Sequence, residues 1–181
     1  AIKTVLLQQR SSGGGSTITQ QLAKLLFHEP PRTKIGRIKQ KIKEWIIAVR
    51  LERAYTKEEI ITMYFNQFDY LNQAVGIKSA SYVYFNTQPD SLRTEQAALL
   101  VGMAKNPALY NPVDSVKAKS ARKRRNIVLI QMKRYDFMEV KVSDSLKQLP
   151  LSLDFQRISH TEGLATYFRE FLRRLMMAKE P

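Results

Sequence analysis

Glycine and proline interrupt this 181-residue chain at few positions, and the segments between them carry apolar residues at helical spacing. The chain contains 7 glycines and 7 prolines, and no segment shows the strict apolar–polar alternation of a half-buried strand. After the glycine run 13–15, Ile18, Leu22, Leu25 and Leu26 follow at spacings typical of one helix face. The pattern predicts a mostly α protein.

Capping residues and helix breakers give the expected helix bounds. We predict helices from Ile18 to before Pro30, over about 34–54, from the capping box at Thr56, over 76–85, from Ser91 or Thr94 through Met103, and from Asp114 to about Arg134. The second of these helices carries Ile35, Ile38, Ile42, Trp45, Ile46 and Val49 on one face. Residues 136–165 are expected to be loop and linker, followed by an amphipathic helix over about 167–176. We therefore expect one domain over 1–135 and a C-terminal extension over 136–181.

The charge balance indicates an anionic partner. Thirty Lys and Arg against 16 Asp and Glu leave a net charge of +14, which favours nucleic acid, a phosphate-bearing ligand or an anionic membrane surface. The absence of cysteine excludes disulfides and thiolate metal sites. No apolar run approaches the roughly 18–20 residues needed to cross a bilayer. The chain begins without Met, in mid-pattern, so we expect it to be a piece of a longer protein.

The glycine run and the helix after it form the first candidate site. Glycines allow close approach of a ligand, Ser16 or Thr17 can cap the helix, and its N-terminal N–H groups attract anions. At 100° per residue, Thr17, Gln20, Gln21 and Lys24 share a face opposite Ile18, Leu22 and Leu25, and Lys24 could reach a phosphate. The alternative is an ordinary glycine loop with a solvated helix face, which the pattern alone favours because it is neither a Walker A nor a Rossmann motif.

The next helix carries a second candidate cluster. Arg37, Lys41 and Glu44 fall within about 60° of one another around the helix. A lone carboxylate among cations can orient a lysine, hold a divalent ion or move a proton. Taken alone, the spacing is more typical of a surface ion pair. The basic stretch 115–134 could likewise follow a nucleic acid or a lipid headgroup layer, or form a solvated face.

Several segments together resemble the peptidoglycan glycosyltransferases (family 51), the transglycosylase domain of class A penicillin-binding proteins. The eleven residues 14–24, Gly-Gly-Ser-Thr-Ile-Thr-Gln-Gln-Leu-Ala-Lys, are similar to the family's second motif. Residues 41–44 resemble the third, with Gln40 where an Arg is usual, and residues 60–66 the fourth, with Thr62 where a Glu is usual. Residues 95–107 and 110–112 are similar to the fifth. The resemblance covers about residues 10–135.

This resemblance implies a lysozyme-like α-helical fold that polymerises lipid II. The 4-hydroxyl of one disaccharide attacks the anomeric carbon of a growing strand with inversion, and undecaprenyl pyrophosphate leaves. It implies substrate binding by nine residues: Ser16, Thr17, Gln20, Gln21, Lys24, Arg32, Arg37, Lys41 and Asn66. Glu44 would be the second acidic residue, orienting Lys41 or a metal-bridged pyrophosphate. No cofactor is required, although a divalent Mg or Mn ion bridging the pyrophosphate is left open.

The sequence departs from the family's motif pattern at the general base. The family's first motif, which holds the catalytic Glu, lies upstream of the glycine run, and residues 1–12 contain no carboxylate. We therefore expect a domain incomplete at its N-terminus and inactive alone, with 136–181 a linker toward a transpeptidase domain. The implied partners are lipid II, the growing glycan strand and the membrane surface, at the periplasmic face of the inner membrane. A non-catalytic lipid-binding scaffold is the alternative; a nucleic-acid module has no need of the polar face at Gln20 and Lys24.

Overall fold

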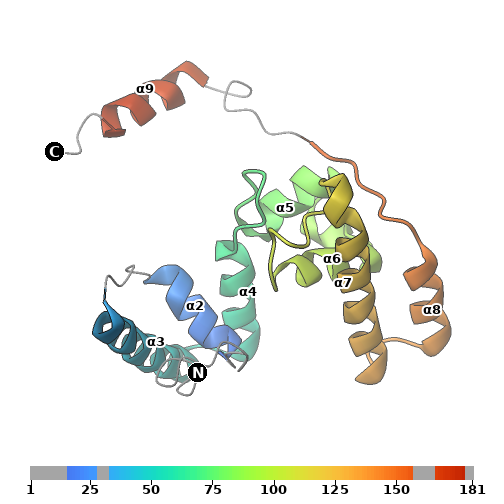
Figure 1. Cartoon of the computed structure of the whole chain (residues 1–181), viewed down its shortest axis with the longest axis horizontal. Coiled ribbons are helices and arrows are strands. Elements are labelled where there is room, and N and C mark those ends of the chain that lie inside the picture. Colours follow the sequence, from blue (N-terminus) through green and yellow to red (C-terminus); the bar gives the residue numbers. More distant parts are fainter. Residues whose placement is uncertain (1–15, 28–32, 157–165, 178–181) are drawn as a thin grey trace.

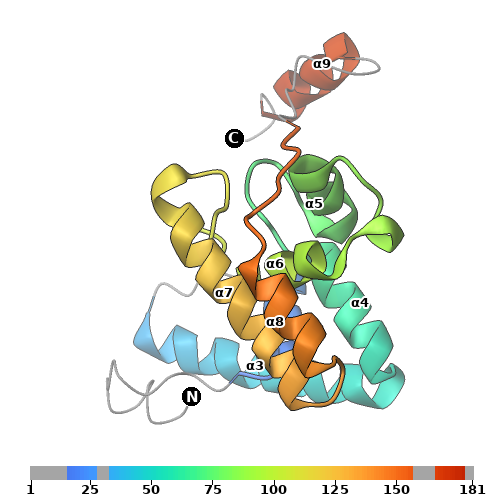
Figure 2. The same cartoon turned by 90° about the vertical axis from the view of Figure 1, so that its right-hand side faces the viewer.

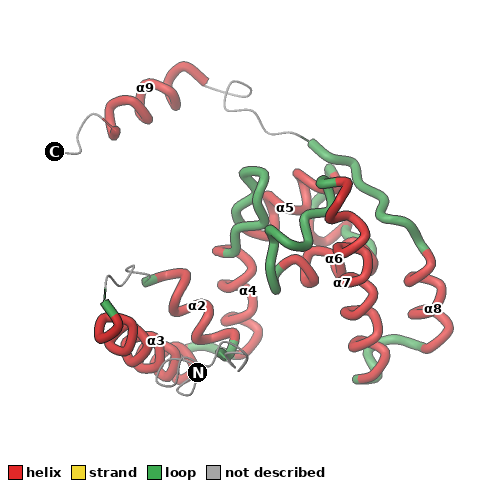
Figure 3. Tube along the Cα trace, viewed as in Figure 1, coloured by secondary structure: helices red, strands yellow, loops and turns green. Residues whose placement is uncertain are grey.

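The computed structural model describes residues 16–27, 33–156 and 166–177, and within them it is mostly α-helical, as predicted. The helices are α2 (Ile18–Leu26), α3 (Lys34–Ala54), α4 (Lys57–Gln67), α5 (Gly76–Phe85), the 3₁₀ helix η1 (Pro89–Ser91), α6 (Thr94–Met103), α7 (Ser115–Arg134), α8 (Val140–Gln148) and α9 (Thr166–Met177) (Figure 1). The described residues form no strand, only an isolated bridge between Asp69 and Val75 (Figure 3). None of their helices is long and apolar enough to span a bilayer.

Local capping explains where several helices begin. Thr17 Oγ1 accepts from the Gln20 amide at 3.2 Å, so Thr17 rather than Ser16 caps α2. Thr56 and Glu59 form the predicted reciprocal capping box at α4. Asp114 accepts from the amides of Val116 and Lys117 and caps α7. These bonds satisfy N–H groups that a helix start otherwise leaves unpaired, and they confirm the predicted starts.

Two apolar clusters hold the helices together. The smaller cluster, Leu22, Ile60 and Tyr64, joins α2 to α4. The larger cluster lies between α5, α6, α7 and the loop that follows α4. It includes Tyr70, Tyr84, Leu99 and Met103. Helix α2 packs against both α3 and α4, and α6 packs along α7 (Figure 1). Helix α4 thus connects the α2–α3 pair to the rest of the helical body.

The apolar face predicted for α3 is not the face that this helix buries, and the apolar face predicted for α2 is buried only in part. In α3 the buried residues are Gln40, Glu44 and Ala48, whereas the apolar row Ile35, Ile38, Ile42, Ile46 and Val49 is 39–69% exposed. Ile18 and Leu25 of α2 are also exposed, and its buried residues are Thr19, Leu22 and Ala23. The polar face of α3 is buried because its groups find partners there: Gln40 Nε2 donates to the Phe27 carbonyl oxygen at 3.3 Å.

The prediction that residues 136–165 are loop and linker is wrong for α8. This helix packs against α7 (Figure 2), and the buried guanidinium of Arg125 donates to the carbonyls at its C-terminal end. The chain then continues onto α5, where the amides of Asp154 and Gln156 donate to the Tyr84 and Val83 carbonyls at 3.1 and 2.7 Å. The helical body therefore extends past residue 135. Whether 136–181 serves as a linker stays a prediction.

Candidate functional site

A cavity of about 420 Å³ opens where α2, α3, α4 and the chain after α6 meet. Its lining comprises Ser16, Gln20, Gln21, Lys24, Leu25, Lys41, Glu44, Tyr64, Phe68 and Lys105. We call it the α2–α3 pocket. It gathers polar side chains from the start of α2 and the middle of α3, and the aromatic side chains of Tyr64 and Phe68 form part of its wall.

The pocket brings together six of the ten residues proposed as site residues from the sequence: Ser16, Gln20, Gln21, Lys24, Lys41 and Glu44. The remaining residues lie elsewhere. Thr17 caps α2 and lines a different cavity. Arg37 and Asn66 are exposed and do not line the pocket, and Arg32 lies outside the described residues. The roles of these four residues stay predictions.

The polar groups of the pocket form one hydrogen-bonded chain. Lys41 Nζ lies 2.6 Å from Glu44 Oε2 and donates to Ser16 Oγ at 3.2 Å. Gln21 Nε2 donates to the Ser16 carbonyl at 3.4 Å, and the Tyr64 hydroxyl donates to Gln21 Oε1 at 3.1 Å. The Glu44 side chain is only 6% exposed. The Lys41–Glu44 pair is therefore a largely buried part of the site and not the surface ion pair that its spacing alone suggests.

The charge of the pocket is positive. Among the described residues that line it, three lysines, Lys24, Lys41 and Lys105, face one carboxylate, Glu44, which leaves a formal net charge of +2. Within the described ranges, neither Lys24 nor Lys105 forms an ion pair with a carboxylate. The N-terminal turn of α2 adds the positive end of a helix dipole. Such a pocket attracts a ligand with at least two negative charges.

Sequence reasoning missed three residues that line the pocket, Lys105, Tyr64 and Phe68. Lys105 follows the C-terminus of α6, more than sixty residues beyond Lys41 in the chain. No helical spacing relates it to residues of α2 or α3. Tyr64 is 5% exposed and belongs to an apolar cluster, yet its hydroxyl reaches Gln21. Only the tertiary packing of α4 on α2, with the chain after α6 beside them, brings these side chains to the pocket.

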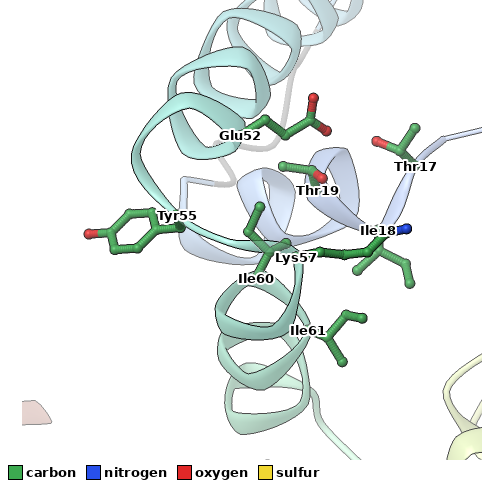
Figure 4. Close-up of a pocket in the computed structure, with 8 residues that line it drawn as sticks. All are labelled: Thr17, Ile18, Thr19, Glu52, Tyr55, Lys57, Ile60 and Ile61. Atoms are coloured by element: carbon green, nitrogen blue, oxygen red, sulfur yellow. The ribbon is translucent and has the colours of Figure 1, made fainter.

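A second cavity of about 410 Å³ lies where the start of α2 meets the end of α3 and the start of α4 (Figure 4). Its lining is mainly apolar, with Ile18, Ile60 and Ile61, and it holds one acidic and one basic residue, Glu52 and Lys57. Thr17 and Thr19 lie on this side of α2 in the close-up. The first turn of α2 therefore borders a cavity with an apolar lining as well as the cationic α2–α3 pocket.

The comparisons with known proteins identify the family. A family model described as transglycosylase matches residues 1–133. Penicillin-binding protein 2a of Streptococcus pneumoniae serotype 2 is 43% identical over 121 residues, which make up 67% of this chain and 16% of that protein. Penicillin-binding protein 1A of Escherichia coli (strain K12) is 39% identical over 132 residues, or 73% of this chain and 15% of that protein.

The similarity in structure points to the same fold. The crystal structure of penicillin-binding protein 1A from Haemophilus influenzae matches 88% of this chain and 20% of that chain, with a TM-score of 0.50 and 22% sequence identity. The chain spans less than a fifth of the length of the Streptococcus pneumoniae and Escherichia coli relatives. Because the family match covers most of the chain and includes the residues that line the pocket from α2 and α3, the chain belongs to the transglycosylase family and is a transglycosylase domain of the class A penicillin-binding protein type.

Proposed function

We propose that this domain takes part in polymerising peptidoglycan glycan strands from lipid II, and that the α2–α3 pocket binds the pyrophosphate of the donor strand. In this reaction the 4-hydroxyl oxygen of the acceptor forms a bond to the anomeric carbon of the donor, the bond from that carbon to the pyrophosphate oxygen breaks, and the hydroxyl proton passes to a base. The observation that supports the proposal most directly is the net charge of +2 beside the start of α2.

The lysines of the pocket suit a pyrophosphate leaving group. Negative charge increases on the pyrophosphate as its bond to the sugar breaks, and fixed cations stabilise that charge more in the transition state than in the bound substrate. Lys41 is fixed by Glu44 and Ser16. Lys24 and Lys105 bring the other two ammonium groups. We assign the pyrophosphate to these three lysines, with Gln20 and Gln21 as neutral neighbours.

Glu44 is poorly placed to be the general base. Its Oε2 is paired with the Lys41 ammonium at 2.6 Å, on the cationic side of the pocket that we assign to the leaving group. Among the described residues that line the pocket, it is also the only carboxylate. We therefore propose that Glu44 orients Lys41, that the base comes from an upstream acidic motif, and that residues 1–181 alone bind substrate without polymerising it. A positioned base contributes about 10² to 10⁴ in rate.

A divalent ion is not required by this scheme. The described residues contain no cluster of three or more His, Asp or Glu side chains that could hold a metal ion, so an Mg or Mn ion would be held by the pyrophosphate, with Glu44 as the carboxylate among the described pocket residues. Polymerisation measured with and without a chelator, in a version extended upstream, tests this assignment.

Lysine substitutions test the pyrophosphate assignment. In a version extended through the upstream acidic motif, Lys24→Ala should lower lipid II turnover about ten- to hundredfold, since a hydrogen bond to a charged group contributes about 1.5–3 kcal/mol. Lys123→Ala, at an exposed position of α7, is the matched control and should leave turnover unchanged. Equal turnover of Lys24→Ala and the control would contradict the assignment. An extended version that binds lipid II but forms no strands would instead favour the lipid-binding scaffold.

The exposed row of α3 supports a position at a membrane surface. Ile35, Ile38, Ile42 and Ile46 project from a helix that also carries many Lys and Arg residues, a combination typical of helices that lie in the headgroup region of anionic bilayers. We place the parent protein at the periplasmic face of the inner membrane, joined to a transpeptidase domain. Co-sedimentation with vesicles containing anionic lipid should fall for Ile38→Ser combined with Ile42→Ser; unchanged co-sedimentation would argue against this face.

A further inference from the structure

The Tyr64 hydroxyl connects the aromatic core to the α2–α3 pocket. Tyr64 lies on α4 and is 5% exposed. Its ring packs against Phe65 and Phe68, each with ring centroids 5.5 Å away. The hydroxyl donates to Gln21 Oε1 at 3.1 Å. A side chain fixed at its ring by two aromatic neighbours thus presents one polar atom to the pocket.

The Gln21 side chain connects the Tyr64 hydroxyl to the start of α2 through two hydrogen bonds. Its amide oxygen accepts from Tyr64, and its Nε2 donates to the Ser16 carbonyl at 3.4 Å. The Ser16 carbonyl can only accept, so it selects the orientation in which Nε2 faces it, and in that orientation the amide oxygen faces the Tyr64 hydroxyl, which donates to it. Ser16 is also the residue whose Oγ accepts from Lys41 at 3.2 Å.

We infer that Tyr64 is a positioning residue for the pyrophosphate pocket: its hydroxyl orients the Gln21 amide, which holds Ser16 where Lys41 meets it. The ligand in this inference rests on the proposed function, whereas the orientation of Gln21 does not. The three residues come from α4, α2 and the chain entering α2, so the hydroxyl also ties the position of α4 to the geometry of the pocket.

The Tyr64 hydroxyl is a proton donor at neutral pH, and burial raises its pKa above that of a free tyrosine. The neighbouring Tyr70 offers a contrast, since it is fully buried and its hydroxyl has no hydrogen-bond partner among the described residues. Its ring lies 5.0 Å from that of Phe68. Tyr70 is therefore in the same aromatic row without a link to the pocket.

The test compares Tyr64→Phe with Tyr70→Phe in the 181-residue chain. Each substitution removes one hydroxyl and keeps the ring. The first readout is calorimetric titration with inorganic pyrophosphate at low ionic strength. We expect Tyr64→Phe to bind about three- to tenfold more weakly than the unsubstituted chain, the size expected for one hydrogen bond, and Tyr70→Phe to bind equally well.

The second readout needs no ligand. In a ¹⁵N–¹H correlation spectrum, the side-chain amide signals of Gln21 should move toward those of free glutamine in Tyr64→Phe and stay in place in Tyr70→Phe. Unmoved Gln21 signals in Tyr64→Phe would overturn the inference, and so would moved signals with unchanged pyrophosphate affinity. If the unsubstituted chain does not bind pyrophosphate, the proposed function loses its ligand, and the Gln21 signals alone decide whether Tyr64 positions the amide.

Discussion

Replacing Arg125 by Met tests how α8 is held on the helical body. Arg125 lies on α7 and is 1% exposed. Its guanidinium donates to the Leu149 and Pro150 carbonyls at 2.8 and 3.1 Å, and to the Lys147 and Leu146 carbonyls at 3.3 and 3.4 Å. Lys147 lies in the last turn of α8 and Leu149 is its C-cap residue, where the end of a helix leaves carbonyls without intrahelical partners. The Leu146 carbonyl also accepts from the Leu149 amide, and Pro150 follows the helix. Arg125 thus caps the C-terminus of α8 from another helix.

The expected loss is smaller than the sum of these bonds. Hydrogen bonds to a charged group contribute about 1.5–3 kcal/mol each, but Met keeps the apolar stem in place. Gln148, Leu149 and Pro150 are exposed, so water can reach part of the vacated site. Burial also lowers the pKa of Arg125, which means that its charge is partly desolvated, and Met removes this cost. We expect a loss of about 2–4 kcal/mol, or a fall in Tm of about 4–16 °C for a chain of this size.

Urea denaturation followed by circular dichroism measures this loss, and hydrogen exchange locates it. The amides of α8 should exchange much faster in Arg125→Met, while those of α2 and α4 should change little. Lys123→Met, two positions earlier on the same helix and exposed, should cost less than about 0.5 kcal/mol. A stability for Arg125→Met equal to that of the control, or a loss without faster exchange in α8, would refute the capping role.

Two further substitutions test the backbone and a cap. Gly76→Ala should cost about 2–4 kcal/mol, because Gly76 has a φ of +81° and an added Cβ would lie 2.7 Å from the Asn66 carbonyl oxygen. Thermal unfolding measures this cost, with Gly102→Ala as the milder comparison, because its Cβ would lie 3.2 Å from Arg124 Cγ and 3.5 Å from backbone atoms of Arg124 and Arg125. Asp114→Asn keeps the cap acceptor but removes the carboxylate charge. In the folded chain, a hydrogen bond from Lys117 lowers the pKa of this carboxyl below its usual 3.8. Because the folded pKa is lowered, the stabilisation by the charge is complete above pH about 4 and is lost as the pH falls through the folded pKa. Denaturation from pH 7 to pH 2 should therefore show the free energies of unfolding of the two chains converging. A difference that stays constant with pH would contradict this.

Helix bounds could be predicted from the sequence because the interactions that set them are local. The capping box of Thr56 and Glu59 spans four residues, and the bounds of α3 and α5 coincide with the predicted 34–54 and 76–85. The start of α7 follows from Asp114 accepting from amides two and three residues ahead. None of these interactions depends on a distant segment.

The sequence alone was less informative about α8. Its residues 140–148 include few strong helix formers, and its stability comes from contacts that are remote in the chain, such as Ser143 Oγ donating to the Leu129 carbonyl at 3.4 Å. Propensity is a weak prior that tertiary packing overrides. The same holds for Lys105, which no spacing rule relates to Lys24 or Lys41.

By itself, the sequence determined most of the helices, the family and six side chains of the pocket, since caps and motifs consist of residues close together in the chain. Only the tertiary structure decided which faces are buried. The row from Ile35 to Val49 stands exposed while Gln40 and Glu44 of the same helix are buried, because α2 packs on the polar face and its neighbours satisfy those groups. A helix carries several candidate faces, and the free energy of burying each depends on the partner it meets, which is a property of the fold and not of the segment.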